Sequence, residues 1–205
     1  MKRLLSVTSL VLFASLSAVA QEYPKAEVFG GYSFFRAEGG TNLNGWNASV
    51  NGNLNSWFGL VADFSGHYDS SSSRSELSLP GFPGFPGLPP VLTVFDAETS
   101  IHNFLAGPRF SYRKNQRITP FAHVLLGASR RHIESEVTVG VLGRTFLSGN
   151  NTAFAAALGG GLDVELSKNI ALRVVQADYV LTRSFGSNGN NARVSAGIVF
   201  RFGNK

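Results

Sequence analysis

Residues 154–166 read FAAALGGGLDVEL, and their side chains alternate in character from one position to the next. One face would hold the larger apolar side chains, which are Phe154, Ala156, Leu158, Leu162, Val164 and Leu166. The other face would hold Ala155, Ala157, Gly159, Gly161, Asp163 and Glu165. A period of two is typical of a β-strand whose two faces meet different surroundings. This stretch therefore predicts a strand with one apolar face and one face of small and charged residues.

The same alternation recurs along most of the chain. It is clear in residues 45–53, 58–68, 104–113 and 192–202, and less regular in 26–35 and 118–130. In residues 170–182 the pattern slips by one position, and a β-bulge near Val174-Val175 would restore it. The sequence thus predicts eight strands.

The predicted connections alternate in length. Short polar turns fall near 53–56, 114–117 and 167–169, whereas longer links fall near 36–44, 69–98, 132–152 and 183–191. Short turns at one end and long links at the other describe an antiparallel up-and-down arrangement. An even number of such strands closes into a barrel and leaves no open edge. We therefore expect an all-β, eight-stranded, antiparallel up-and-down barrel.

Alternation alone leaves open whether the apolar face points inward, as in a soluble barrel, or outward, as in a transmembrane barrel. Charged residues make up only 15% of the chain, whereas a soluble surface usually holds about 25–35%. Aromatic residues of the apolar face gather near the strand ends, as in the girdles of transmembrane barrels. Small residues with isolated charges suit the narrow interior of an eight-stranded barrel. These features favour apolar side chains facing outward.

The first twenty residues differ from the rest. Lys2 and Arg3 precede a short apolar run, and Ala18-Val19-Ala20 is a small-residue cleavage pattern. We expect residues 1–20 to be a signal peptide for export and residues 21–205 to form one barrel domain.

Without Lys2 and Arg3 the chain has 16 basic and 13 acidic residues. The basic residues are scattered, so nucleic acid is not an expected partner. Cysteine is absent, which removes thiolate chemistry.

The sequence resembles the small outer-membrane β-barrels of the OmpA and OmpX kind, which form the outer membrane protein β-barrel domain family. The resemblance rests on EVFGGYSFFR (27–36), FLAGPRFSYR (104–113), ITPFAHVLLGAS (118–129), LGGGLDVEL (158–166), RVVQADYVLTRSF (173–185) and VSAGIVFRFG (194–203). It implies a place in the outer membrane of a Gram-negative bacterium, in contact with membrane lipid and lipopolysaccharide. It also implies a structural or surface-interaction role through long external loops, without cofactors.

Several charged residues would face the bore of such a barrel. The candidates are Glu27, Asp63, Arg109, Asp163, Glu165, Arg173, Asp178, Arg193 and Arg201. One interpretation is a plug of ion pairs that neutralise one another. The alternative is a gated, narrow channel for ions or small solutes, opened by exchange of ion-pair partners.

Catalysis has little support in the sequence. The four histidines do not form a compact metal-binding pattern, and no spacing fixes a catalytic triad. His102 lies where an enzyme acting on lipid A would place a catalytic group, but an interfacial polar role suits it better. Gly159-Gly160-Gly161 lacks the lysine of a phosphate loop and lies within a strand. We expect neither an enzyme nor a metal site.

Residues 80–90 read PGFPGFPGLPP. Three Gly-X-Y triplets are too few for a collagen helix, and the flanking strands belong to one arrangement, which excludes an interdomain linker. We expect the centre of an external loop, stiffened by proline, with a mobile serine-rich base at 70–75. It is either a solvated tip or a contact for a surface partner or lipopolysaccharide through Phe82, Phe85 and Leu88.

Overall fold

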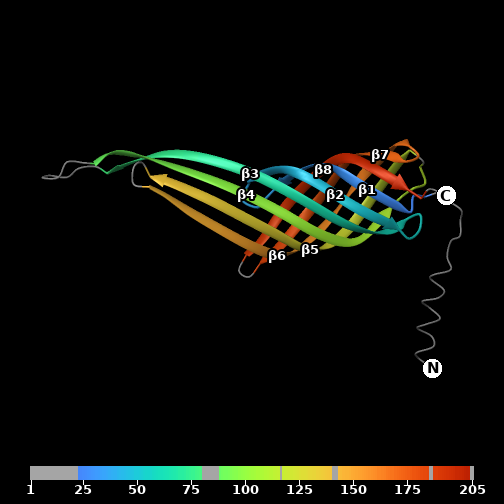
Figure 1. The fold of residues 1–205 in the computed structure, drawn as a ribbon. Helices are drawn as coiled ribbons and strands as arrows, with labels where there is room; N and C mark the ends of the chain where they lie inside the picture. Colours follow the sequence, from blue (N-terminus) through green and yellow to red (C-terminus); the bar gives the residue numbers. More distant parts are fainter. Residues whose placement is uncertain (1–22, 80–87, 116, 140–142, 185–186, 204–205) are drawn as a thin grey trace, which may run out of the picture.

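The computed structural model describes residues 23–79, 88–115, 117–139, 143–184 and 187–203 (Figure 1). Its strands are β1 (Ala26–Arg36), β2 (Asn42–Asn53), β3 (Phe58–Leu79), β4 (Leu88–Ser111), β5 (Ile118–Val139), β6 (Gly143–Ser167), β7 (Ile170–Ser184) and β8 (Ser187–Phe202). Each strand pairs antiparallel with the next, and β8 pairs with β1 to close the barrel. The predicted eight-stranded up-and-down barrel is confirmed. Among these residues, no helix is long and apolar enough to cross a membrane.

The apolar face points outward, as predicted. Leu60, Phe104 and Leu158 are 55%, 53% and 63% exposed, although they lie in the middle of paired strands. The alternate positions are buried and largely polar. In water such an arrangement would expose most of the apolar side chains of the strands to solvent. The outer face of the barrel therefore suits contact with the hydrocarbon of a membrane.

Aromatic side chains border the outward apolar face at both ends. At the end with the short turns, Trp57 stacks on Phe110 with ring centroids 6.0 Å apart, and Phe58 lies 5.5 Å from Phe110. Nearer the other end, Phe64 meets Phe104 edge-on at 5.9 Å. Rings at the boundary between hydrocarbon and headgroups are the expected girdles of a transmembrane barrel.

The predicted bulge in β7 is present. Arg173 pairs with Gly197 of β8, whereas the next paired residue is Gln176, opposite Ser195. Val174 and Val175 therefore both point outward, at 49% and 40% exposure. The extra residue returns Gln176 and Asp178 to the bore, which the simple alternation had placed on the wrong face.

The two less regular strands, β1 and β5, carry apolar side chains on both faces. Phe29 and Phe35 of β1 and Phe121 and Leu125 of β5 point into the barrel and are buried. The alternation weakens there because the bore is partly apolar.

The long links at 69–98, 132–152 and 183–191 were predicted as loops, and this prediction is wrong for most of their length. Pairing between β3 and β4 continues from Phe58–Phe110 out to Leu79–Leu88, and pairing between β5 and β6 continues to Val139–Gly143. β7 and β8 likewise pair as far as Ser184–Ser187. The serine-rich base at 70–75 is thus a paired strand. The backbone N–H and C=O groups of serine and threonine pair between strands as well as those of apolar residues do. Figure 1 shows the β3–β4 and β5–β6 hairpins reaching far beyond the barrel.

Candidate functional site

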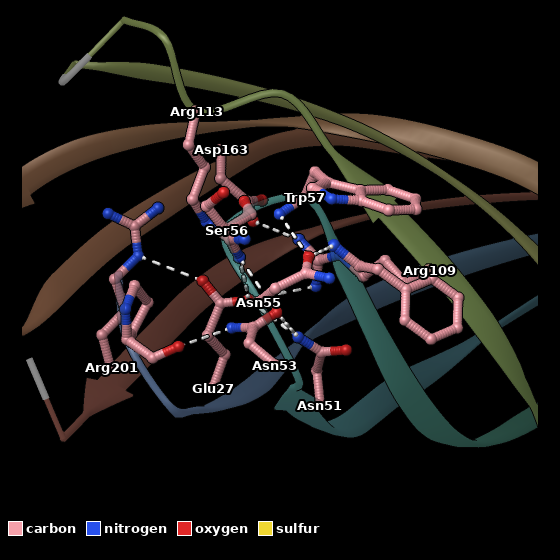
Figure 2. Close-up of polar contacts among 12 residues, drawn as sticks. Glu27, Asn51, Asn53, Asn55, Ser56, Trp57, Arg109, Arg113, Asp163 and Arg201 are labelled. Carbon is pink, nitrogen blue, oxygen red and sulfur yellow. Dashed lines mark hydrogen bonds and ion pairs between the residues drawn. The ribbon is translucent and has the colours of Figure 1, made fainter. Parts of the chain in front are cut away.

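The bore of the barrel is filled by charged side chains that contact one another. Near the end with the short turns, the Glu27 carboxylate on β1 lies 3.6 Å from Arg109, 3.2 Å from Arg113 and 3.4 Å from Arg201. Figure 2 shows Glu27 beside Arg201 and Arg113, with Asn51 and Asn53 below it. Asn51 donates to Glu27 at 3.1 Å. One carboxylate thus faces three guanidinium groups, two from the end of β4 and the turn that follows it and one from the end of β8.

Asp163 on β6 completes this first layer. It accepts from Arg109 at 2.9 Å and from Arg173 at 2.8 and 3.1 Å. The guanidinium of Arg173 also lies 4.3 Å from the ring centroid of Phe29 and 4.4 Å from that of Phe121. The inward phenylalanines therefore stack on buried cations, an arrangement that favours a desolvated guanidinium.

A second layer centres on Arg193 of β8. Its guanidinium contacts Asp63 at 2.6 Å and Asp178 at 2.7 Å. His123 lies 2.7 Å from the other oxygen of Asp178. Gln176 accepts from Arg173 at 2.7 Å and donates to Asp178 at 2.9 Å, so it joins the two layers. The charged side chains form one continuous network through the barrel.

A glycine makes room for this network. A Cβ placed on Gly159 of β6 would collide with the side-chain oxygen of Asp178 and with the backbone of the neighbouring strand. The triple glycine 159–161 thus lets the facing strand and its carboxylate approach closely.

The structure places all nine candidate bore residues on the inward face. Eight of them are at most 4% exposed, and Glu165 lies at the open end, where it pairs with Arg201 at 2.9 Å. The candidate set lacked Arg113, although the alternation in 104–113 had already put this residue on the inward face. With Arg113 the network holds five carboxylates and five guanidinium groups, so its formal charges cancel.

Around and beyond the second layer the bore is filled by uncharged side chains. Many of them are apolar and form a buried cluster of Phe35, Ala37, Leu43, Val61, Ile101, Leu105, Leu125, Ala155, Ala157 and Val180, and others, such as Asn103 and Ser129, are polar. The Phe35 ring lies 4.8 Å from the ring of His67, whose Nε2 contacts Ser33 at 2.8 Å. Above the cluster, at the mouth between the hairpins, lies a hollow of about 250 Å³ that Glu38, Arg131 and Asn151 help to line.

The hairpins of β3–β6 continue as a four-stranded sheet, which we call the outer sheet (69–79, 88–99, 131–139 and 143–153). On its outward face, Glu98 pairs with Glu134 and Asp96 with Glu136 across β4 and β5. These four carboxylates border a second hollow of about 350 Å³. In the part of the chain that the structure describes, no group of three or more His, Asp or Glu side chains could hold a metal ion.

The predicted loop contact falls mainly outside the described residues. Phe82 and Phe85 lie in the segment 80–87, and of Leu88 only the backbone, at the start of β4, is described.

The model of the outer membrane protein beta-barrel domain family matches residues 6–202. The chain belongs to this family. Outer membrane protein beta-barrel domains lie in the outer membrane of Gram-negative bacteria, and the outward apolar face described above fits that membrane. A search of the curated proteins finds no match.

Solved structures of other outer-membrane barrels are similar in fold. Ail, the attachment invasion locus protein of Yersinia pestis, solved with the heparin analogue sucrose octasulfate, is 19% identical with a TM-score of 0.54, over 86% of this chain and 97% of Ail. Neisserial surface protein A is 12% identical with a TM-score of 0.49, over 87% and 97% of the two chains. The N-terminal barrel of Pseudomonas aeruginosa OprF is 12% identical with a TM-score of 0.44, over 89% and 100%.

Proposed function

We propose that this outer-membrane barrel is a surface-interaction protein whose outer sheet contacts a ligand outside the cell. The length of β3–β6 carries the proposal. These strands have 22, 24, 22 and 25 residues, whereas about 9–11 residues suffice to cross the membrane. The surplus forms a regular paired sheet outside the bilayer, where a scaffold without an external partner would need only short turns.

The filling of the bore supports this role over that of a channel. The inward carboxylates and guanidinium groups are paired, and the apolar cluster follows them toward the exterior. Conduction would require breaking buried ion pairs, and leaving one charge of such a pair without its partner costs about 3–5 kcal/mol. In planar bilayers we therefore expect no conductance steps from the refolded protein. Regular steps that change in size in Arg193→Met would support the narrow channel instead.

The charge of the outer sheet supports a cationic ligand. The sheet carries six carboxylates, Asp69, Glu76, Asp96, Glu98, Glu134 and Glu136, against three guanidinium groups, Arg74, Arg131 and Arg144. Like charges directly opposite in a sheet destabilise it, so a ligand cation between Glu98 and Glu134 would relieve their repulsion, although His132 already lies 2.9 Å from Glu134. Ail has been solved with a sulfated sugar, whereas here we propose a ligand rich in lysine or arginine.

The segment between β3 and β4 extends this proposal. Phe82 and Phe85 of the segment 80–87, with Leu88 at the start of β4, would add apolar contacts to the ligand. If adhesion of cells that display the protein is the same with Phe82→Ser and Phe85→Ser together, these phenylalanines have no such role.

The test uses refolded protein in detergent, with fluorescent polylysine and sucrose octasulfate as probes. We expect polylysine to bind and Glu98→Gln with Glu134→Gln to weaken it about ten-fold, about 1.4 kcal/mol. Asp69→Asn, a carboxylate on the opposite face of the same sheet, is the matched control. Equal binding of polylysine to the double variant, or preferential binding of sucrose octasulfate, contradicts the proposal.

A further inference from the structure

The hollow of about 250 Å³ at the mouth of the barrel has an apolar floor and polar walls. Phe35 and Ile101 of the buried cluster, which are 1% and 4% exposed, form the floor. The walls come from β5–β8 and from the turn after β1, and most of their side chains carry amide, hydroxyl or charged groups. A concave site with a few convergent polar groups over an apolar base is the usual form of a small-molecule site.

Two opposite charges line this hollow without pairing with each other. Arg131 of β5 pairs through its backbone with Ile101 and Asn151, which also line the hollow, and its side chain has no partner among the described residues. Glu38 lies in the turn between β1 and β2. In the closed ring of eight strands, β5 lies four strands from β1. The guanidinium and the carboxylate therefore face the hollow from opposite walls.

Glu38 is held in place by β8. Its backbone N–H donates to Oδ1 of Asn191 at 3.0 Å, and its Oε2 accepts from the backbone N–H of Asn190 at 2.9 Å. Its Oε1 has no hydrogen-bond donor within the part of the chain that the structure describes. A carboxylate fixed in this way loses little side-chain freedom when a ligand binds to its other oxygen.

The neutral polar groups of the wall are also ordered. Asn191 donates to the Thr182 hydroxyl at 3.4 Å, and a Cβ on Gly189 would lie 2.4 Å from that hydroxyl, so the glycine leaves room for it. On β6, Oδ1 of Asn151 accepts from Ser184 at 3.1 Å. This bond turns the amide so that its Nδ2 donors remain available, since no described residue accepts from them.

The two charges determine which kind of molecule fits. A simple anion or cation would leave one of the charges without a counterion, and a neutral sugar would pair with neither. A molecule with an ammonium group at one end and a carboxylate at the other pairs with both, and the planar guanidinium matches a carboxylate. A round hollow of this volume is about 8 Å across, and an extended dipeptide spans at most about 7 Å. A free amino acid spans about half of that length and is too short to reach both walls.

We propose that the mouth of the barrel binds a short zwitterionic peptide of about two residues. Arg131 holds its terminal carboxylate, and Glu38 accepts from its terminal ammonium group. Asn151 donates to the peptide carbonyl, and a peptide side chain lies against Phe35. Because the floor is buried and apolar, the peptide is held at the mouth and is not conducted. The hollow is separate from the outward carboxylates of the outer sheet, so this inference goes beyond the proposed surface interaction and does not depend on it.

The experiment follows the amide NMR signals of labelled, refolded protein in detergent during titration with a peptide. The probes are alanylalanine, its N-acetyl form, its C-terminal amide, free alanine and glucose. We expect alanylalanine to bind in the millimolar range, and Arg131→Gln or Glu38→Gln to weaken its binding about ten-fold each. Arg130→Gln is the matched control, because Arg130 is exposed and is the neighbour of Arg131 on the outward face of β5. Each variant must retain the gel shift between unheated and boiled samples, which reports a folded barrel.

The blocked peptides test the two contacts separately. Acetylation removes the ammonium group, so the acetylated peptide should bind equally to the wild type and to Glu38→Gln. The amide lacks the carboxylate, so it should bind equally to the wild type and to Arg131→Gln.

Several results would overturn the proposal. These are the absence of saturable shifts with alanylalanine, unchanged binding in both variants, and binding of either blocked form as tight as that of the free dipeptide. Tighter binding of glucose would assign the hollow to sugars instead. Free alanine that binds as tightly as the dipeptide would contradict a ligand that spans the mouth.

Discussion

The guanidinium of Arg193 on β8 lies 2.6 Å from the carboxylate of Asp63 on β3, although 130 residues separate the two in sequence. No pairing of neighbouring strands brings β3 and β8 together, so this contact crosses the bore. It therefore ties opposite walls of the barrel, and both side chains are almost fully buried.

Replacing Arg193 is expected to cost more than any exposed substitution. Arg193→Met leaves Asp63 and Asp178 without their shared cation, and an uncompensated buried charge typically costs about 3–5 kcal/mol. Urea unfolding of the refolded protein, followed by tryptophan fluorescence, measures the loss. The triple variant with Asp63→Asn and Asp178→Asn should regain much of the stability. A single variant as stable as the wild type would show that the network contributes little.

Gly159→Ala is expected to destabilise the barrel, because its Cβ would meet the Asp178 carboxylate and the adjoining backbone. Overpacking of a filled interior typically costs about 1–3 kcal/mol. Gly149→Ala, in the same strand, is the control, since nothing lies within 4 Å of a Cβ there. The comparison of the two unfolding midpoints in urea tests this. Equal midpoints would mean that the glycine is dispensable.

The outer sheet should show a histidine that titrates above its ordinary range. Hydrogen bonds to Glu134 and then to Asn150 raise the pKa of His132, because the imidazolium donates to both side chains. These bonds should be complete below the ordinary pKa of histidine and lost as the pH rises through the raised pKa of His132. NMR titration measures it, and Glu134→Gln should move the pKa of His132 back down. An unchanged value in that variant would contradict the assignment.

Export should remove the first twenty residues. We expect the protein isolated from the outer membrane to begin at Gln21, because the small residues Ala18 and Ala20 suit signal peptidase. Intact-mass measurement checks the boundary. Ala18→Leu with Ala20→Leu should give a longer chain, and an uncut wild type would contradict the proposal.

The fold could be predicted because a two-residue period determines which side chains share a face. The period located the strands, and its slip located the bulge at Val174-Val175. It also identified the inward carboxylates and guanidinium groups. It did not identify their partners, because Arg193 reaches Asp63 across the bore and not along a neighbouring strand. Contacts of that kind depend on the diameter and tilt of the closed barrel.

The ends of the strands were the least predictable feature. Serines 70–73 carry no apolar alternation, so they resembled a loop, yet they pair with β4. Backbone hydrogen bonds in a hairpin outside the membrane do not need an apolar face once a long partner strand is present. In the same way, Phe29 and Phe121 blurred the alternation, because stacking on guanidinium groups places aromatic rings in a polar interior.

The seam between β1 and β8 joins Ala26 to Phe202, so the first strand finds its second neighbour only when the last one arrives. Before β8 pairs with β1, two rows of unpaired backbone amide and carbonyl groups would face hydrocarbon. Each unpaired group would cost several kcal/mol of free energy. Partial insertion of seven strands is thus strongly disfavoured. A chain that lacks β8 is therefore expected not to insert stably in the bilayer.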